Sequence, residues 1–489
     1  MKELSKWQII SFISRGVAML LGLIQSLFIV RLLTVSEWGL VQLAISIGGA
    51  LGIYQHLGLA SASTREVSAA KDNKEIFKIF ITSGVIRYLV TIPIVIGLFF
   101  YSDKISTGVY HNPEIELPLK LYAIVLLFQG FQSILNSVIA GTKRFKHLFL
   151  YQALIAVVSV ALYVPFVFLY RVNGYFYALL GFNIIATLTL AYIAFNPMKK
   201  ELELPDLKDF KRLFKELFSI SIGIYLVKII YTNWEKLGPN LLGLNLDADI
   251  VGYFGFALLY AKKLMNVSDA VTDVNLPVFS DKFVHDMVGF KNTFAENFNK
   301  LFVFIVFAGS AAVYWAPEIV RLVVGGDKYD PALPLILPLV FAFVLYSFVN
   351  IVKSSVIIPA KLVKEMVLSF IILILGTLVF FYTTKVYLGN LTSMAYGLVF
   401  GAFLSFLLLM ATSQVRLRFK FITHDHVLLL FEGLAIAYIG VIDNLWIKVL
   451  VFIVLTGVFL YGTYIARFIN KSDLQMVINK FSKIRGATI

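Results

Sequence analysis

Apolar stretches of about 20 residues recur along nearly the whole chain, and they constrain its fold more than any other feature. A helix needs about 20 mostly apolar residues to cross the hydrocarbon core of a bilayer. Because lipid offers no hydrogen-bond partner to the backbone, an uninterrupted helix is the form that such a stretch takes. The sequence therefore predicts an all-α integral membrane protein with about 14 transmembrane helices, at residues 8–30, 39–60, 79–101, 119–141, 149–170, 175–195, 217–239, 250–271, 300–320, 331–352, 363–384, 391–412, 426–442 and 446–467.

The composition supports this prediction. Of the 489 residues, 59% are hydrophobic, 15% are charged and none is cysteine, whereas a soluble domain is about half apolar and about a quarter charged. These values exclude a soluble enzyme, a disordered protein and a disulfide-stabilised secreted domain. The loops between the spans average roughly 13 residues. Because such loops cannot hold a folded catalytic domain, we do not expect the protein to be an enzyme.

The basic residues predict the orientation in the membrane. Of the 43 Lys and Arg residues, 29 fall on one side of the predicted spans, 8 on the other side and six within the spans. Basic loops are retained in the cytoplasm, so both termini are expected there, in a multi-pass protein of the inner (plasma) membrane. Basic residues in the cytoplasmic loops therefore explain the net charge of +14, and nucleic acid is not an expected partner.

The longest predicted cytoplasmic loop, residues 196–216, divides the chain after the sixth span. Its segment DLKDFKRLFKELF has apolar residues at helical spacing with lysines between them, which predicts an interfacial amphipathic helix. Six spans before the loop and six after it favour two pseudo-symmetric lobes around a central cavity. The expected domains are an N-lobe (1–195), a linker (196–216), a C-lobe (217–412), two further helices (413–468) and a basic cytoplasmic tail (469–489).

Polar side chains within the spans gather on the first, second, seventh and eighth of them. Ionisable groups are costly in a bilayer and usually face a bundle interior or a wet cavity. Several recur at helical spacing and so share one helix face: Arg15 and Gln25 in the first span; Gln42, Ser46 and Gln55 in the second; Tyr225, Lys228, Thr232 and Glu235 in the seventh; Lys262, Asn266, Asp269 and Asp273 in the eighth.

Each polar face has a structural interpretation as well as a functional one. Lys228 and Glu235 lie seven residues apart on one face and could form a structural pair, while the small residues Gly48 and Gly52 are typical of close helix packing. His56 could be a satisfied polar residue at a helix end. The deep cations outnumber the deep carboxylates, however, and a purely structural pairing would not need that surplus. A cavity that binds an anion would.

Four segments resemble those of a known family. They are RLLTVSEWGLVQLAISI (31–47), LGLASASTREVSA (57–69), LGLNLDADIVGYFGFALLYAKKL (242–264) and LPVFSDKF (276–283). Their order, spacing and positions in the spans resemble those of the polysaccharide transporter (O-antigen flippase-like) family of the multidrug/oligosaccharidyl-lipid/polysaccharide exporter superfamily. With the arrangement of spans, the resemblance covers essentially the whole chain.

The resemblance implies a flippase that moves polyprenyl-diphosphate-linked oligosaccharides, such as O-antigen, capsule or exopolysaccharide repeat units, from the inner to the outer leaflet by alternating access. It implies a cationic cavity for the diphosphate, and Glu235-Lys236 in NWEKLG looks like the family's acidic-basic pair. The expected substrate-binding cations are Arg15, Lys228, Lys236, Lys262 and Lys263; the ion-coupling candidates are Glu235, Asp269 and Asp273, binding H⁺ or Na⁺. No other cofactor or metal is expected. A monomer is expected, with a polysaccharide polymerase and glycosyltransferases as pathway partners.

Three other functions are weighed against this one. A cation-coupled exporter of drugs or organic cations should have an acidic, aromatic cavity, and the surplus of cations argues against it. A membrane polymerase or glycosyltransferase needs a sizeable outer loop, whereas the longest one here, near 102–118, is short. A flippase of the peptidoglycan precursor is a close relative of the favoured function.

Overall fold

The computed structural model describes residues 21–22, 24–142, 144–196, 203–244, 246–263, 279, 282–440, 442 and 444–468. Within these ranges every regular element is a helix, which confirms the predicted all-α fold. Some predicted residues lie outside the described ones: Arg15, Asn266, Asp269, Asp273, the side chain of Lys228 and the tail 469–489.

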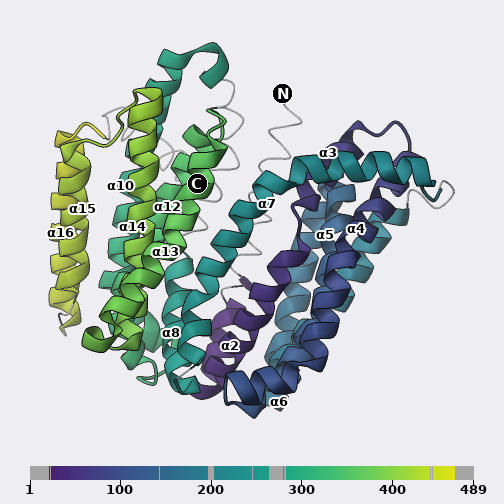
Figure 1. Cartoon of the computed structure of the whole chain (residues 1–489). Helices are drawn as coiled ribbons and strands as arrows, with labels where there is room; N and C mark the ends of the chain where they lie inside the picture. The colour runs from purple at the N-terminus through teal and green to yellow at the C-terminus, as the bar shows by residue number, and fades with distance from the viewer. Residues whose placement is uncertain are drawn as a thin grey trace, which may run out of the picture. The chain divides into compact units, whose positions relative to one another are not determined.

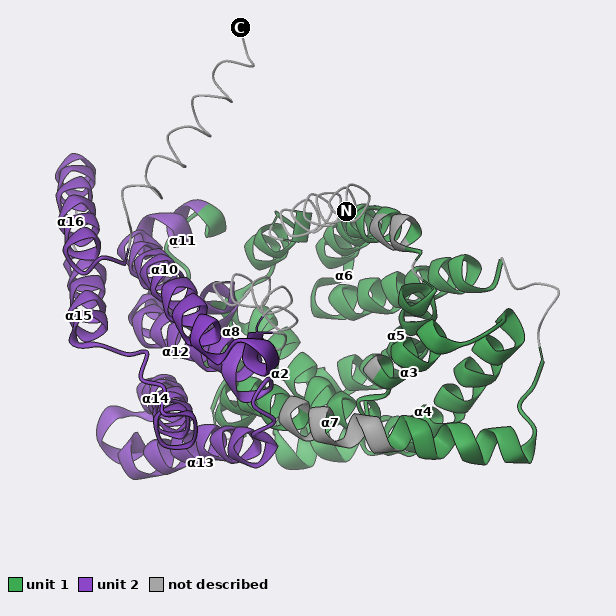
Figure 2. Cartoon of the chain, turned by 90° about the horizontal axis from the view of Figure 1, so that it is seen from above, with its two compact units in different colours: residues 1–256, 323–329 green, residues 257–322, 330–489 purple. Residues whose placement is uncertain are grey.

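Contacts divide the chain into two compact units, which Figure 2 colours separately. Unit 1 holds residues 1–256 and 323–329, and unit 2 holds residues 257–322 and 330–489. The helix α7 (Leu207–Gly243) belongs to unit 1, where it packs against α2 (Val35–Gly52), α3 (Leu59–Ala69) and α4 (Asn73–Phe100). The two units are defined by contacts between residues, whereas the predicted lobes rest on the number of spans before and after the linker. The two divisions are not equivalent, so the predicted domain boundaries stay a prediction.

The helices follow the predicted spans, and in the described part nine are long and apolar enough to cross a membrane. Besides the helices named above, unit 1 contains α5 (Glu116–Gly141), α6 (Phe145–Phe195) and most of α8 (Ala248–Lys262). Unit 2 contains the end of α8, α10 (Met287–Tyr314), most of α11 (Ala316–Val324), α12 (Leu333–Val352), α13 (Val363–Leu388), α14 (Asn390–Leu417), α15 (His424–Ile439) and α16 (Leu445–Ile465).

The predicted fifth and sixth spans are joined in α6, which is interrupted by a kink at Arg171. The backbone there has a φ of 55° and a ψ of −126°, a conformation that non-glycine residues rarely adopt. The Arg171 guanidinium donates to both carboxylate oxygens of Glu37, at 2.8 Å each. Glu37 and Thr34 form the capping box that begins α2. One ion pair therefore ties the turn between two predicted spans to the start of a third.

The predicted amphipathic helix and the seventh span form one continuous helix, α7. Figure 1 shows its first part running across the end of unit 1 before it bends into the span. Leu213 and Leu217 are buried in two apolar clusters of unit 1, while Leu207 is exposed. On the polar side, Lys78 of α4 lies 2.8 Å from a Glu203 oxygen and 2.9 Å from an Asp209 oxygen. These ion pairs hold the start of α7 against α4.

Unit 2 is organised around α12, which packs against α10 and α14 and is buried over nearly all of its apolar length. On α10, Phe290, Phe294, Phe298 and Phe302 recur every four residues and all are buried. The ring of Phe302 stacks on Phe348 of α12 with ring centroids 4.9 Å apart. An aromatic stripe thus forms the contact between these two helices.

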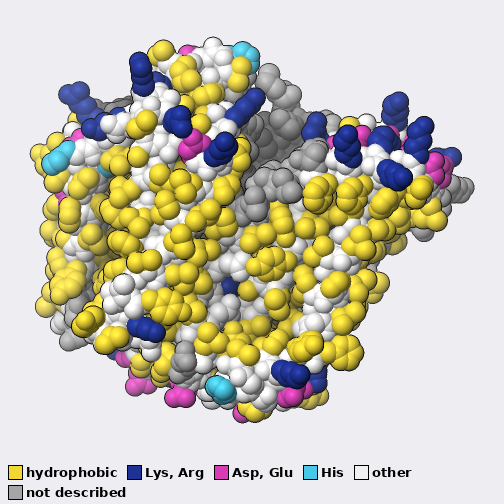
Figure 3. All heavy atoms as spheres, in the orientation of Figure 1, with side chains coloured by type: hydrophobic (Ala, Val, Ile, Leu, Met, Phe, Trp, Pro, Cys, Tyr) yellow, Lys and Arg dark blue, Asp and Glu magenta, His cyan; other side chains and the backbone are white. Residues whose placement is uncertain are grey.

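Side chains are distributed as a bilayer requires. In Figure 3, hydrophobic side chains cover the middle of the face in view, and charged side chains gather at its upper and lower ends. Many large apolar residues of the spans are exposed, including Leu188, Leu154 and Val379. Exposed aliphatic residues in such numbers fit a surface that contacts lipid. The protein is a multi-pass membrane protein.

Candidate functional site

In unit 1, the polar face of α7 lies against α2. The hydroxyl of Ser46 donates to the backbone carbonyl of Lys236 over 3.1 Å. A Cβ placed on Gly49 would lie 3.4 Å from Cε of Lys236, which is van der Waals contact, so the lysine side chain passes close to Gly49. Ser46 and Lys236 are predicted lining residues of two different spans, and the structure brings them together.

Glu235 and Lys236 are the predicted acidic-basic pair. The carboxylate of Glu235 is almost fully buried, and its Oε1 lies 3.8 Å from Nζ of Lys236. At this distance the two charges attract without a direct hydrogen bond. Thr232, one turn earlier on α7, is half-buried. A buried carboxylate beside a lysine in a membrane-spanning helix is a costly arrangement that usually marks function.

Three other predicted lining residues have structural partners in unit 1. The Tyr225 hydroxyl donates to the carbonyl of Tyr54 over 2.7 Å. Gln42 lies over Gly255 of α8, where a Cβ would come within 2.6 Å of its Cγ. Gln25 accepts a hydrogen bond from the hydroxyl of Ser159. These contacts hold α7, α8 and the helix before α2 in place, so packing explains at least part of their polarity.

Lys262 and Lys263 lie at the end of α8 and belong to unit 2, where both are half-buried. Glu235 and Lys236 thus belong to unit 1, whereas Lys262 and Lys263 belong to unit 2. Their role as substrate-binding cations stays a prediction.

Gln55 belongs to a buried network around Arg87, which is fully buried in α4. The Nη2 of Arg87 lies 3.0 Å from Nδ1 of His56, while its Nε and Nη1 have no partner in the described part of the chain. Thr91 donates to Oε1 of Gln55 over 3.1 Å. Because arginine can only donate, His56 accepts at Nδ1 and carries its proton on Nε2. The imidazole is thus neutral.

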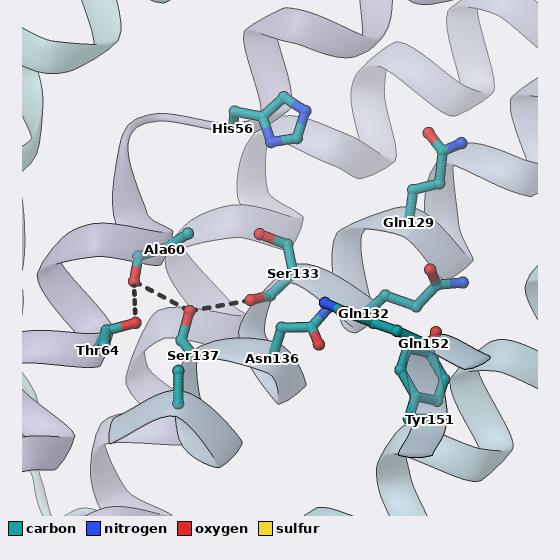
Figure 4. A pocket seen from close by; sticks show the side chains of 11 residues that line it. His56, Ala60, Thr64, Gln129, Gln132, Ser133, Asn136, Ser137, Tyr151 and Gln152 are labelled. Carbon is teal, nitrogen blue, oxygen red and sulfur yellow. Dashed lines mark hydrogen bonds between the residues drawn. The ribbon is translucent and has the colours of Figure 1, made fainter. Parts of the chain in front are cut away.

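His56 also lines a cavity of about 690 Å³ in unit 1, which Figure 4 shows from close by. Residues of α3, α5 and α6 form its wall. The full lining is His56, Ala60, Thr64, Gln129, Gln132, Ser133, Asn136, Ser137, Ala140, Tyr151 and Gln152. Apart from His56, no described lining residue is ionisable below pH 9 or so.

The ionisable groups of the predicted spans do not point to this cavity. Its wall on α5 consists of amides and hydroxyls instead. Gln129, Gln132, Ser133, Asn136 and Ser137 follow one another at intervals of three, one, three and one residues, which places them on one helix face. This row of neutral polar residues on one helix face is the sequence signal for the cavity.

At the predicted outer end of the first span, two cations cap the helix that precedes α2. Nζ of Lys328 donates to the carbonyls of Val30, Arg31 and Leu33 at 2.9, 3.2 and 2.8 Å. Arg171 donates to the intervening carbonyl of Leu32 at 2.7 Å. The last carbonyls of a helix have no partner within it and carry partial negative charge. Burial lowers the pKa of Lys328, and these carbonyls compensate its charge.

The comparisons with known proteins agree with this description. A family model described as "Polysaccharide biosynthesis protein" matches residues 28–334, more than half of the chain. No curated protein matches.

Solved structures with the same fold include a flippase and transporters. The lipid II flippase MurJ in an inward closed conformation is 14% identical, with a TM-score of 0.70 over 95% of this chain and 99% of that one. An inward-facing multidrug resistance MATE family transporter of the MOP superfamily is also 14% identical, with a TM-score of 0.70 over 83% of this chain and 98% of that one. The eukaryotic MATE transporter AtDTX14 is 13% identical, with a TM-score of 0.60 over 90% and 99%. These likenesses confirm the predicted transporter fold.

Proposed function

This chain belongs to the family of polysaccharide biosynthesis proteins, and on that premise we propose that it is a flippase for polyprenyl-diphosphate-linked oligosaccharides. Repeat units of O-antigen, capsule or exopolysaccharide are the proposed cargo. The two halves of the chain would alternate between inward-open and outward-open states and carry the cargo from the inner to the outer leaflet. The lipid tail would stay in the bilayer while the diphosphate and the sugars pass through the protein.

The observation that supports this function best is the polar contact between α2 and α7. It places Lys236 and the buried Glu235 beside Ser46 and Gly49, within helices of a membrane protein. A lysine there offers a cation to the diphosphate as a point charge. We propose that Arg15, Lys228, Lys262 and Lys263 contribute further positive charge to the same cargo.

We propose Glu235 as the site of ion coupling. Asp269 and Asp273, which lie outside the described residues, are further candidates. While Glu235 is ionised, it partly neutralises Lys236 across 3.8 Å. A bound H⁺ or Na⁺ would cancel that carboxylate charge and so strengthen the attraction between Lys236 and the diphosphate. Ion and cargo would then increase each other's affinity, as linkage requires.

A multidrug exporter is the main alternative within the superfamily, and the likeness to MATE transporters concerns the fold alone. We favour the anionic, lipid-linked cargo, because the matching family model is that of polysaccharide biosynthesis proteins and Lys236 offers a cation beside the α2–α7 contact. The expected pathway partners are the glycosyltransferases that build it and the polymerase that uses it, at the inner (plasma) membrane.

The test is complementation of a strain that lacks its own flippase, with surface polysaccharide as the readout. We expect the wild type to restore the polysaccharide and Lys236→Ala to reduce it at least tenfold. Lys364→Ala is the matched control, because Lys364 is exposed on α13 in unit 2 and should leave the polysaccharide unchanged. Full complementation by Lys236→Ala at wild-type protein levels would contradict the proposed diphosphate site.

A further inference from the structure

We propose that the cavity between α3, α5 and α6 binds uncharged sugar rings of the cargo, an inference that rests on the proposed function. The cavity of about 690 Å³ falls within the range of about 300–1,000 Å³ that is usual for small-molecule sites. It therefore has room for a short oligosaccharide rather than for a single ion.

The lining offers hydrogen bonds that the described protein does not use. The side chains of Gln129, Ser133 and Asn136 make no hydrogen bond within the described part of the chain, and Oε1 of Gln152 is buried there without a partner. Buried polar groups are nearly always hydrogen-bonded to protein, water or ligand. Oε1 of Gln152 therefore calls for a donor in the cavity, and the half-buried Gln129, Ser133 and Asn136 beside it offer further donors and acceptors to an occupant.

Amides and hydroxyls match the chemistry of a sugar. A carboxamide donates through its nitrogen and accepts through its oxygen, and a hydroxyl does both. Sugar hydroxyls and acetamido groups present the same mixture of donors and acceptors. Tyr151, which also lines the cavity, adds an apolar ring face.

The neutral character of the described lining favours uncharged sugars over the diphosphate and acidic sugars. No Lys, Arg, Asp or Glu is among the described lining residues. Arg87 is hydrogen-bonded to Nδ1 of His56 and is itself fully buried. A carboxylate or phosphate placed in this cavity would be desolvated without a cation partner, which is strongly unfavourable. The geometry therefore assigns the neutral sugars to this cavity and the diphosphate to the Lys236 region.

The position along the membrane fits the route of the cargo. The lining residues of α5 occupy the half of that helix that ends at Gly141, and Tyr151 and Gln152 lie near the start of α6. The basic loop between these helices is on the predicted cytoplasmic side. Sugars of a cargo built at the inner leaflet would meet this cavity first.

The experiment uses the absence of cysteine from the sequence. Two variants of the full chain, Ser133→Cys in the cavity and Thr232→Cys beside Glu235, are placed in liposomes and reacted with N-ethylmaleimide. One probe is undecaprenyl diphosphate, which carries no sugar. The other is lipid-linked oligosaccharide extracted from cells that make it. Ser68→Cys, exposed at the end of α3, is the control for general reactivity.

We expect both probes to slow the labelling of Thr232→Cys several-fold, and the oligosaccharide alone to slow that of Ser133→Cys. In a Ser133→Cys background, Asn136→Leu should remove that protection. Protection of Thr232→Cys by both probes without protection of Ser133→Cys by the oligosaccharide overturns the sugar site and leaves the proposed function intact. If neither cysteine is protected by either probe, the proposed function fails together with the sugar site.

Discussion

Arg87 of α4 donates a hydrogen bond to His56, with Nη2 of the arginine 3.0 Å from Nδ1 of the histidine. The arginine is fully buried, and two of its nitrogens have no partner in the described part of the chain. Nδ1 of His56 thus binds a buried guanidinium, and the same residue lines a polar cavity. A structural element and a candidate binding site share this histidine.

Replacing His56 by leucine should destabilise unit 1. The guanidinium would lose the hydrogen bond to His56 inside the protein, at a cost of about 3 kcal/mol. His56→Gln should cost less, because a glutamine oxygen can accept from Arg87. Thermal unfolding of the purified protein in detergent checks this order. Equal unfolding temperatures for the leucine and glutamine variants would show that the hydrogen bond contributes nothing.

At Arg171, glycine should be better tolerated than alanine. Both substitutions remove the ion pair with Glu37, but glycine relieves the positive φ of 55°, which is worth about 1 kcal/mol. The Arg171→Gly variant should therefore unfold at a higher temperature than Arg171→Ala. The opposite order would indicate that the kink carries no strain.

Removing Lys328 should loosen the segment 323–329 locally. The Lys328→Met variant leaves the carbonyls of Val30, Arg31 and Leu33 without this donor, and the part-buried carbonyls of Val30 and Leu33 would each cost about 1–3 kcal/mol if left unpaired. Hydrogen exchange of this segment should become at least tenfold faster. Lys364→Met, at an exposed position, should leave the rate unchanged; unchanged exchange in Lys328→Met would refute the capping role.

Acidification should release the start of α7. Hydrogen bonds from Lys78 lower the pKa of both Glu203 and Asp209 below their ordinary values of 4.5 and 3.8. Because these pKa values are depressed in the folded state, the stabilisation is complete above the ordinary values and is lost as the pH falls through the lowered ones. Hydrogen exchange over residues 203–212, corrected for intrinsic rates, should therefore accelerate below about pH 4.5. In Lys78→Met this pH dependence should largely disappear.

The sequence predicted the helices well because membrane spans are specified locally, by 20 apolar residues in a row. The kink at Arg171 is one feature that apolar stretches locate, because one predicted span ends at residue 170 and the next begins at residue 175. They do not reveal its cause, since the partner Glu37 lies 134 residues away in the chain. Likewise, no local signal places Lys328 against the carbonyls of residues 30–33.

Helix periodicity and residue type indicate only part of the candidate site, and the role of its residues stays a prediction. Helical spacing found the polar face of α7, because ionisable groups in apolar segments stand out. It missed the wall formed by Gln129, Ser133 and Asn136, because neutral amides and hydroxyls are common in helices of every kind. Only the packing of α3 and α6 against α5 turns that stripe into a cavity.

The most direct test of the central claim is lipid translocation in proteoliposomes that contain the purified full chain. A lipid-linked oligosaccharide with a fluorescent label on its sugar is placed in one leaflet, and its appearance in the other is followed by quenching from outside. We predict translocation well above the protein-free rate, reduced at least tenfold in Lys236→Ala and unchanged in Lys364→Ala. A rate equal to that of protein-free liposomes, with any ion gradient imposed in either direction, would contradict the account.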